Sequence, residues 1–389
     1  MLNVRNICIL SIGMFLLNGC SSDEMVLSEE LNETSEYVTG NSSYKIRLKT
    51  HAATMTTRAA IVGDESSATL DSLGIFALAR EEQGTNEEAY SIQWFNDSRN
   101  WSFCLMDNVA AKMNNGGSIS WKEEGTFYFY PITQFYNYDF YGYYPYTEDL
   151  TRDDNSITAH YTIDGTQDII WGRATSDEEY AYSAKYYRTY GANATDPTLE
   201  LKHMLTRLTF TVEPGETTEG SGDYASAENM KVKSIEICDA YTNVDLLIAD
   251  RGNLPETEWS NPDNDARLVL RNDVKDTLLL LDEAGDTLNP VQVPTHEWVV
   301  NVNNGKGLQV GESVMLYPAE EYIVRIVLTD ENDVDHISEI PLTLSSNPGT
   351  KFSRGYSYNV RIIVHGPRAI LVKSTLTPWD EVDGPDVEL

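Results

Sequence analysis

The chain has 389 residues with 28 Lys and Arg against 61 Asp and Glu, which gives a formal net charge of −33 at pH 7. This balance argues against nucleic acid as a partner, because nucleic-acid binding depends on basic side chains that neutralise phosphates. It also disfavours binding to an anionic membrane surface. With 41% hydrophobic residues the chain can bury a core, and its length predicts two domains.

Residues 1–19 have the features of a secretory signal peptide. Arg5 supplies a positive start, and the apolar run at 7–17 is shorter than the roughly 20 residues of a membrane-spanning helix. Cys20 follows Gly19 directly, which resembles the lipobox where the thiol of a bacterial lipoprotein is acylated. The sequence therefore predicts lipidation at Cys20, with a plain cleaved signal or a short membrane anchor as the alternatives.

Residues 20–43 form a predicted lipidated tether. They are rich in Ser, Glu, Asn and Thr and hold few large apolar residues, so they cannot bury enough surface to offset the entropy lost on ordering. Asp23 and Glu24 resemble the acidic surface-export signal of some outer-membrane lipoproteins. An ordinary solvated tether is the other interpretation, and both stay open.

From residue 44 onward the patterns predict strands. Residues 44–49 alternate apolar and basic side chains without a break, which is typical of a half-buried strand. In the first half, further apolar or aromatic runs predict strands at 73–78, 127–130 and 138–144. Residues 107–113 predict one or two helical turns instead. A domain boundary is predicted near Asp196 and Pro197.

The second half continues in the same way. Strands are predicted at 199–202, 205–212, 232–237, 267–270, 277–281, 298–302, 314–317, 322–328, 340–344, 356–364 and 370–376. Residues 303–306 (Asn-Asn-Gly-Lys) predict a hairpin turn between two of them. Many short strands with turn signals between them predict an all-β fold of two β-sandwich domains, at 44–196 and 197–389.

Sequence patterns that carry chemistry are few. The six His show no metal-ligand spacing, and the chain has neither a C-x-x-C pair nor a phosphate-binding loop. The acidic stretches at 263–265 and 330–335 lack the Gly and terminal Glu of a calcium loop, so we interpret them as solvated loops. The sequence predicts no enzyme, no metal and no cofactor. An enzyme on a β-sandwich scaffold stays as an alternative, which a cleft with clustered carboxylates would favour.

Two cysteines remain after export, because Cys8 leaves with the signal and Cys20 takes lipid. Cys104 and Cys238 could form one disulfide, which the extracytoplasmic compartment permits, or they could be two buried free thiols. Their distance in sequence decides neither.

Residues 127–146 hold a dense block of Phe and Tyr. Aromatic rings fill sandwich cores and favour strands, and they also stack on sugar rings. Core packing is therefore one interpretation and a glycan or partner surface is the other. A glycan-binding surface lipoprotein would carry its sugar site on exposed aromatics such as Trp94, Trp101 or Trp121.

A set of short motifs occurs in order along the chain: the cysteine at 20, TRAA at 57–60, LGIFA at 73–77, FYGYYPY at 140–146, LKHMLTRLTF at 201–210, GYSYNV at 355–360 and TPW at 377–379. This ordered set resembles the fimbrillin family, the type V pilins and their relatives. The resemblance implies a surface lipoprotein with two transthyretin-like β-sandwich domains in tandem.

The resemblance also implies an assembly mechanism. A trypsin-like protease would cut between Arg58 and Ala59 and release the strand that carries Tyr44, Ile46 and Leu48. A terminal strand from another subunit would then fill the exposed groove. The alternative is that Arg58 stays uncut and residues 44–49 remain a permanent strand.

The last strand signal, with Ile370, Val372 and Leu376, is the predicted donor, although it could also be the closing strand of its own domain. The predicted function is a structural or adhesive subunit of a surface fimbria on the outer membrane. Its predicted partners are other pilus subunits, the membrane through the lipid before processing, and a surface ligand. The stalk, tip and anchor roles stay open, and a glycan-binding lipoprotein is the alternative.

Overall fold

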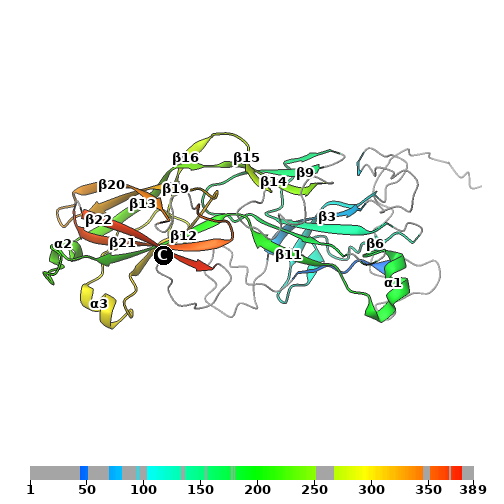
Figure 1. Ribbon diagram of the computed structural model, residues 1–389, viewed down its shortest axis with the longest axis horizontal. Coiled ribbons are helices and arrows are strands. Elements are labelled where there is room, and N and C mark those ends of the chain that lie inside the picture. The colour runs from blue at the N-terminus through cyan, green and yellow to red at the C-terminus, as the bar shows by residue number, and fades with distance from the viewer. Residues whose placement is uncertain are drawn as a thin grey trace, which may run out of the picture.

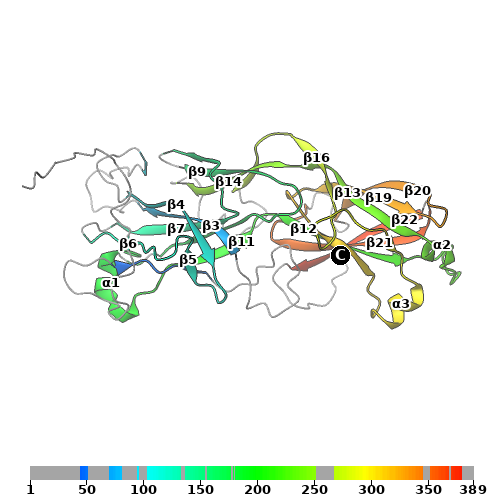
Figure 2. The same cartoon turned by 180° about the vertical axis from the view of Figure 1, so that it is seen from behind.

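The computed structural model describes residues 44–50, 70–80, 94–95, 103–132, 136–153, 156–176, 178, 180–250, 267–344, 351–367 and 369–378. In these residues nearly all regular structure is β-strand, which confirms the predicted all-β fold. The molecule is elongated, with helix α1 (Ala184–Tyr190) at one end and helix α2 (Ala225–Glu228) at the other in both views (Figure 1 and Figure 2).

Two larger sheets occupy the half that contains α1. The first has seven strands in the order β2 (Lys49–Thr50), β11 (Thr198–His203), β10 (Ile170–Ala174), β7 (Tyr138–Tyr144), β3 (Leu70–Ala79), β4 (Cys104–Met113) and β5 (Ile119–Trp121). The second has four strands in the order β15 (Leu268–Leu270), β14 (Asn243–Asp250), β9 (Ser156–Thr162) and β8 (Leu150–Arg152). A small ribbon joins β1 (Tyr44–Lys45) to β6 (Phe129–Tyr130).

Two further sheets build the half that contains α2. One runs β18 (Leu308–Leu316), β12 (Thr206–Pro214), β21 (Tyr356–Gly366) and β22 (Ala369–Pro378), and its β12–β21 pair is parallel. The other runs β16 (Lys275–Leu279), β13 (Lys231–Tyr241), β19 (Glu321–Thr329) and β20 (Asp335–Thr343), with β17 (Val291–Gln292) added to β13. A short 3₁₀ turn, η4 (Gly191–Asn193), follows α1, and helix α3 (His296–Asn301) stands beside α2.

Alternating burial shows why these sequences pair into layers. In β12 every second residue is buried, including Leu208, Phe210 and Val212, so one face of the sheet meets the core. The seven-stranded and four-stranded sheets are joined through Trp171, whose Nε1–H donates to the carbonyl of Ile248 at 2.9 Å. A buried indole needs such an acceptor, so this contact ties the two layers at a fixed distance.

Strand pairing joins parts of the chain that are far apart in sequence. β11 and β14 follow residue 197, and they pair with β10 and β9, which precede it. The first sheet therefore continues to His203, and the chain enters the next sheet at Thr206. The division into two tandem domains at 196/197 stays a prediction.

Three local predictions are wrong. Residues 298–302 were expected to be a strand but lie largely in α3, because the Thr295 side chain accepts the backbone N–H of Trp298 and caps a helix there. The predicted hairpin turn at 303–306 consequently follows a helix, with positive φ at Asn304 and Gly305. Residues 107–113 lie in β4, where the positive φ of Asn108 breaks the alternation that would have indicated a strand.

Candidate functional site

The candidate site is the part of the fold that binds the N-terminal segment 44–50. The predicted single strand is present as β1 and β2, which are joined through Ile46, Arg47 and Leu48. The Ile46 amide donates to the carbonyl of Tyr128 at 2.7 Å, and the Ile119 amide donates to the carbonyl of Leu48 at 3.1 Å. The segment is thus hydrogen-bonded along one side to β5 and to the residue that precedes β6.

Its other side is bonded to the start of the β11 strand. The Lys49 amide donates to the carbonyl of Pro197 at 3.0 Å, and β2 pairs in parallel with Thr198 and Leu199. An extended segment with partners on both sides is inserted into the sheet structure. Its departure would leave unpaired N–H and C=O groups on both neighbours.

The inward side chains of the segment fill an apolar slot. Ile46 and Leu48 are each only 2% exposed. Tyr44 is half-buried and stacks on Tyr187 of α1, with ring centroids 6.2 Å apart, and Tyr130 stacks on the same ring at 5.4 Å. The three residues predicted to form the removable strand therefore do pack inward together.

The outward side chains of the segment are basic, and two of them meet one carboxylate. Arg47 Nε lies 3.4 Å from Asp196 Oδ1, and Lys49 Nζ lies 2.9 Å from Asp196 Oδ2. The Asp196 side chain is 13% exposed and also accepts a hydrogen bond from the Tyr187 hydroxyl at 3.3 Å. Lys45 Nζ lies 3.3 Å from the centre of the Phe127 ring, a cation–π contact.

The predicted donor residues lie in β22, at the edge of its sheet. This strand pairs antiparallel with β21 along its whole length, with Ile370 opposite Val364, Val372 opposite Ile362 and Leu376 opposite Tyr358. Among the described strands β22 has β21 as its one ladder neighbour. The structure thus places the predicted donor as the closing strand of its own sheet.

Several predicted residues lie outside the described part of the chain. They are Cys20, Arg58, Ala59 and Trp101. The segment 51–69, which contains the predicted cleavage point, connects β2 to β3 in sequence.

The aromatic block is mainly core. Tyr130, Tyr138, Phe140 and Tyr143 are fully buried, which supports the packing interpretation for these rings. Trp94 is also buried, and its Nε1–H donates to the carbonyl of Ala79 at 3.1 Å. It therefore offers no exposed face to a sugar ring.

Trp121 is half-buried and meets the Tyr128 ring edge-on, with centroids 5.0 Å apart. Of the two described tryptophans that were expected to carry a sugar site, Trp121 is the more exposed.

Both remaining cysteines are free thiols in the structure. Cys104 is half-buried in β4 and Cys238 is buried in β13. Burial raises the pKa of the Cys104 thiol well above its usual value, and the nearby Asp107 carboxylate adds to this effect. Burial also raises the pKa of Cys238. Neither thiol is activated as a nucleophile, because a reactive cysteine needs a lowered pKa.

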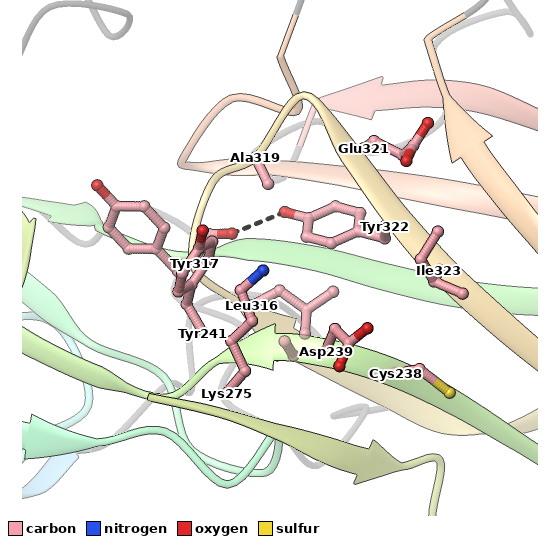
Figure 3. Close-up of a pocket in the computed structure, with 11 residues that line it drawn as sticks. Cys238, Asp239, Tyr241, Lys275, Leu316, Tyr317, Ala319, Glu321, Tyr322 and Ile323 are labelled. Atoms are coloured by element: carbon pink, nitrogen blue, oxygen red, sulfur yellow. Dashed lines mark hydrogen bonds between the residues drawn. The ribbon is translucent and has the colours of Figure 1, made fainter. Parts of the chain in front are cut away.

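A cavity of about 170 Å³ lies where β13 approaches the connection between β18 and β19. Figure 3 shows the Lys275 ammonium, the Tyr241 and Tyr317 rings and the carboxylates of Asp239 and Glu321 around it. Ligand pockets usually enclose about 300–1,000 Å³, so this cavity suits a group no larger than one side chain. No sequence motif predicts this cavity.

A buried hydrogen bond between His203 and Asp168 marks the passage from the first sheet to the next. His203 Nδ1 is hydrogen-bonded to Asp168 Oδ2, and the two side chains are almost fully buried. The adjacent Met204 amide donates to the carbonyl of Ile169 at 2.8 Å. His203 is therefore packed in the core where the chain leaves the first sheet.

In the described part of the chain, no group of three or more His, Cys, Asp or Glu is arranged to hold a metal ion. No helix among the described residues is both long enough and apolar enough to cross a bilayer.

Comparison with known proteins identifies a family that this chain matches. A family model described as fimbrillin-like matches residues 57–379. No curated protein sequence matches the chain.

Similar solved structures include a candidate cell adhesion protein from Bacteroides uniformis, at 14% identity and a TM-score of 0.47, covering 86% of this chain and 97% of that one. A fimbrial protein from Bacteroides vulgatus is 14% identical with a TM-score of 0.39, covering 86% and 99%. The fimbrillin FimA from Porphyromonas gingivalis is 14% identical with a TM-score of 0.40, covering 88% and 99%.

Proposed function

This chain belongs to the fimbrillin-like family, and we propose that it is a structural or adhesive fimbrial subunit that is exported as a lipoprotein and assembles by strand exchange. Family membership supports a pilus-subunit or adhesion role at the cell surface. To this role we add lipoprotein export, a proteolytic step and strand exchange.

The observation that carries the proposal is the seating of residues 44–50. Ile46 and Leu48 are buried in a slot, and the segment has backbone partners on both sides. The segment also precedes the start of the family match at residue 57. A strand that fills the fold and yet lies outside the family region is suited to being replaced by an equivalent strand.

A cut between Arg58 and Ala59 would sever this segment from β3. The segment would then be held only by non-covalent contacts, although two apolar side chains and four basic or aromatic ones still fix it in place. When it leaves, strand addition by another chain would restore both the ladder hydrogen bonds and the buried apolar surface.

We propose β22 of another copy, with Ile370, Val372 and Leu376, as the incoming strand. Figure 1 shows β22 in the half that contains α2, whereas β1 pairs with β6 beside α1 in the other half. Two different surfaces would therefore meet in each contact. Such head-to-tail contacts generate an open filament when the rotation between copies does not close a ring.

Before the cut, acylation at Cys20 would hold the protein to the outer membrane through the tether at 20–43. Stable anchoring needs at least two membrane-binding groups, such as two acyl chains, because a single acyl chain binds the membrane only reversibly. The cut after Arg58 would release the subunit from its lipid. A division into tandem β-sandwich domains at 44–196 and 197–389 is part of the same proposal.

The experiment treats the mature chain with an arginine-specific protease and follows filament formation by light scattering and electron microscopy. The expected result is one cut after Arg58 followed by filaments. The Arg58→Gln variant should stay uncut and monomeric, while the control Arg188→Gln, at an exposed position in α1, should behave as the parent chain. Filaments from uncut Arg58→Gln protein would contradict strand removal.

A further inference from the structure

We propose that Asp196 selects the incoming strand by charge, so that the slot accepts a strand of a second copy in which Lys373 takes the place of Lys49. This inference rests on the strand exchange proposed above and names the residue pair that fixes its register. The starting observation is that one carboxylate, 13% exposed, contacts both Arg47 and Lys49 of the segment to be replaced.

Removal of the segment leaves Asp196 without either of these cations. Of the contacts described for the carboxylate, the hydrogen bond from the Tyr187 hydroxyl remains, because Tyr187 belongs to α1. A new strand would then enclose the carboxylate again. Enclosing a carboxylate without a cation is unfavourable, because the lost hydration is not replaced. A strand with a neutral or acidic residue at this place is therefore disfavoured.

The slot also sets the spacing of the strand that it accepts. Ile46 and Leu48 are two residues apart and point inward, and Lys49 follows directly with its ammonium 2.9 Å from Asp196. In an extended strand alternate residues share a face. The required pattern is thus a large apolar residue, any residue, a second apolar residue and then Lys or Arg.

The chain carries this pattern in its own edge strand. Residues 370–373 read Ile-Leu-Val-Lys, which matches Ile-Arg-Leu-Lys at 46–49 in both apolar positions and in the final lysine. The same pattern also occurs at 119–122, 199–202, 230–233, 268–271, 322–325 and 358–361.

Of these segments, those within or beside β13, β19 and β21 have strand neighbours on both sides. The ones in β5 and β11 border the slot themselves, through Ile119 and through the pairing with β2. β15 and β22 remain as edge strands with a single ladder neighbour among the described strands. β15 has only three residues, whereas β22 has ten, so β22 is the one long enough to fill the slot.

Net charge makes such a local match necessary. Two cut chains that each keep 23 Lys and Arg against 55 Asp and Glu, a formal charge of −32, repel one another. Lys373 of the incoming strand can meet Asp196 in only one register. A shift of that strand by one or two residues would move the lysine away from Asp196 and place a neutral side chain beside the carboxylate, so the matched register is favoured.

The test measures the affinity of peptides for the full mature chain after cleavage at Arg58 and removal of the released segment. The probes are a fluorescent peptide with the sequence of residues 369–378 and the same peptide with Lys373→Glu. The parent peptide should bind at least about tenfold more tightly than the Glu peptide, as expected when an opposite charge is replaced by a like one at a partly enclosed site. In the Asp196→Lys chain the order of the two peptides should reverse.

Two further variants keep the test decisive. Asp196→Asn removes the charge with little change of shape, so the two peptides should bind it with similar affinity even if Asp196→Lys fails to fold. Glu200→Gln removes an exposed carboxylate from the neighbouring β11 strand and should leave the preference intact. Equal binding of both peptides to the parent chain would overturn the charge selection while leaving strand exchange standing. Failure of the cut chain to bind either peptide would overturn both.

Discussion

The Lys49 ammonium lies 2.9 Å from the Asp196 carboxylate, across 147 positions of sequence. Asp196 immediately precedes the Pro197 carbonyl that accepts the Lys49 amide, so one short stretch of chain holds both the backbone and the side chain of the N-terminal segment. This stretch leads from α1 and η4 into β11. The binding site of the N-terminal segment is therefore formed where the chain enters β11, the last strand in sequence of the seven-stranded sheet.

Truncation of Leu48 should destabilise the uncut protein. Leu48→Ala removes a side chain that is 2% exposed and should lower the free energy of unfolding by about 2–5 kcal/mol, because transfer and cavity contributions add. Chemical denaturation followed by circular dichroism measures this change. Val302→Ala is the control, since Val302 is 65% exposed. If the slot is emptied by cleavage, the Leu48→Ala difference should vanish in the cut protein, and its persistence there would contradict strand removal.

Gly172 should not tolerate a methyl group. A Cβ at this position in β10 would lie 2.4 Å from the backbone carbonyl oxygen of Glu200 in β11, so Gly172→Ala must separate the two strands. We expect a loss of stability of more than about 2 kcal/mol. Gly116→Ala is the matched substitution. A Cβ at Gly116 would have no atom within 4 Å, but the residue has a φ of +83°. Backbone strain alone should therefore lower the free energy of unfolding, by about 1 kcal/mol. Equal effects of the two variants would contradict the close approach of β11.

The protein should unfold in alkali through its buried tyrosines. Burial raises the pKa of Tyr141 to about 12, with a contribution from the Asp139 carboxylate, and burial likewise raises the pKa of Tyr182 to about 12. Because the folded-state pKa values lie above the unfolded value of about 10, the stability from these phenols is complete below pH 10. It is lost as the pH rises through 12.

Absorbance at 295 nm and circular dichroism, followed together against pH, test this behaviour. A fraction of the phenols should ionise only with the loss of structure between pH 10 and 12. Ionisation of all tyrosines near pH 10 with the fold intact would contradict the buried positions.

The thiol content should distinguish free cysteines from a disulfide. Burial raises the pKa of both Cys104 and Cys238, so little thiolate is present near pH 8 and the folded chain should react slowly with a thiol reagent. After unfolding without reductant, the mature chain should show two reactive thiols. A chain with none would contradict the free state of both residues.

Sequence patterns predicted much of the fold where strands were bounded by strong turn residues. The aromatic run at 138–144 has the same bounds as β7, because Gly and Pro punctuate it and its rings suit a pleated surface. The strands β9 and β14 were missed, although alternation was present in them: Val244, Leu246 and Ile248 are all buried. Helix α1 was missed too, although Ser183 caps it by accepting the Tyr186 amide.

The candidate site was only partly predictable. The alternation at 44–49 indicated which side chains point inward, and Ile46 and Leu48 do so. The partnership of Arg47 and Lys49 with Asp196 could not be predicted, because it depends on the parallel pairing of β2 with β11. The local alternation of apolar and polar residues carries no information about a contact between two parts of the chain that are so far apart in sequence.

N-terminal sequencing with intact mass measurement, on protein recovered from the cell surface, tests the central claim most directly. The account predicts a chain that begins at Ala59 and carries no lipid, since processing after Arg58 removes residues 20–58 together with the acylated Cys20. A surface protein that still begins at acylated Cys20 would contradict assembly by strand removal for this subunit.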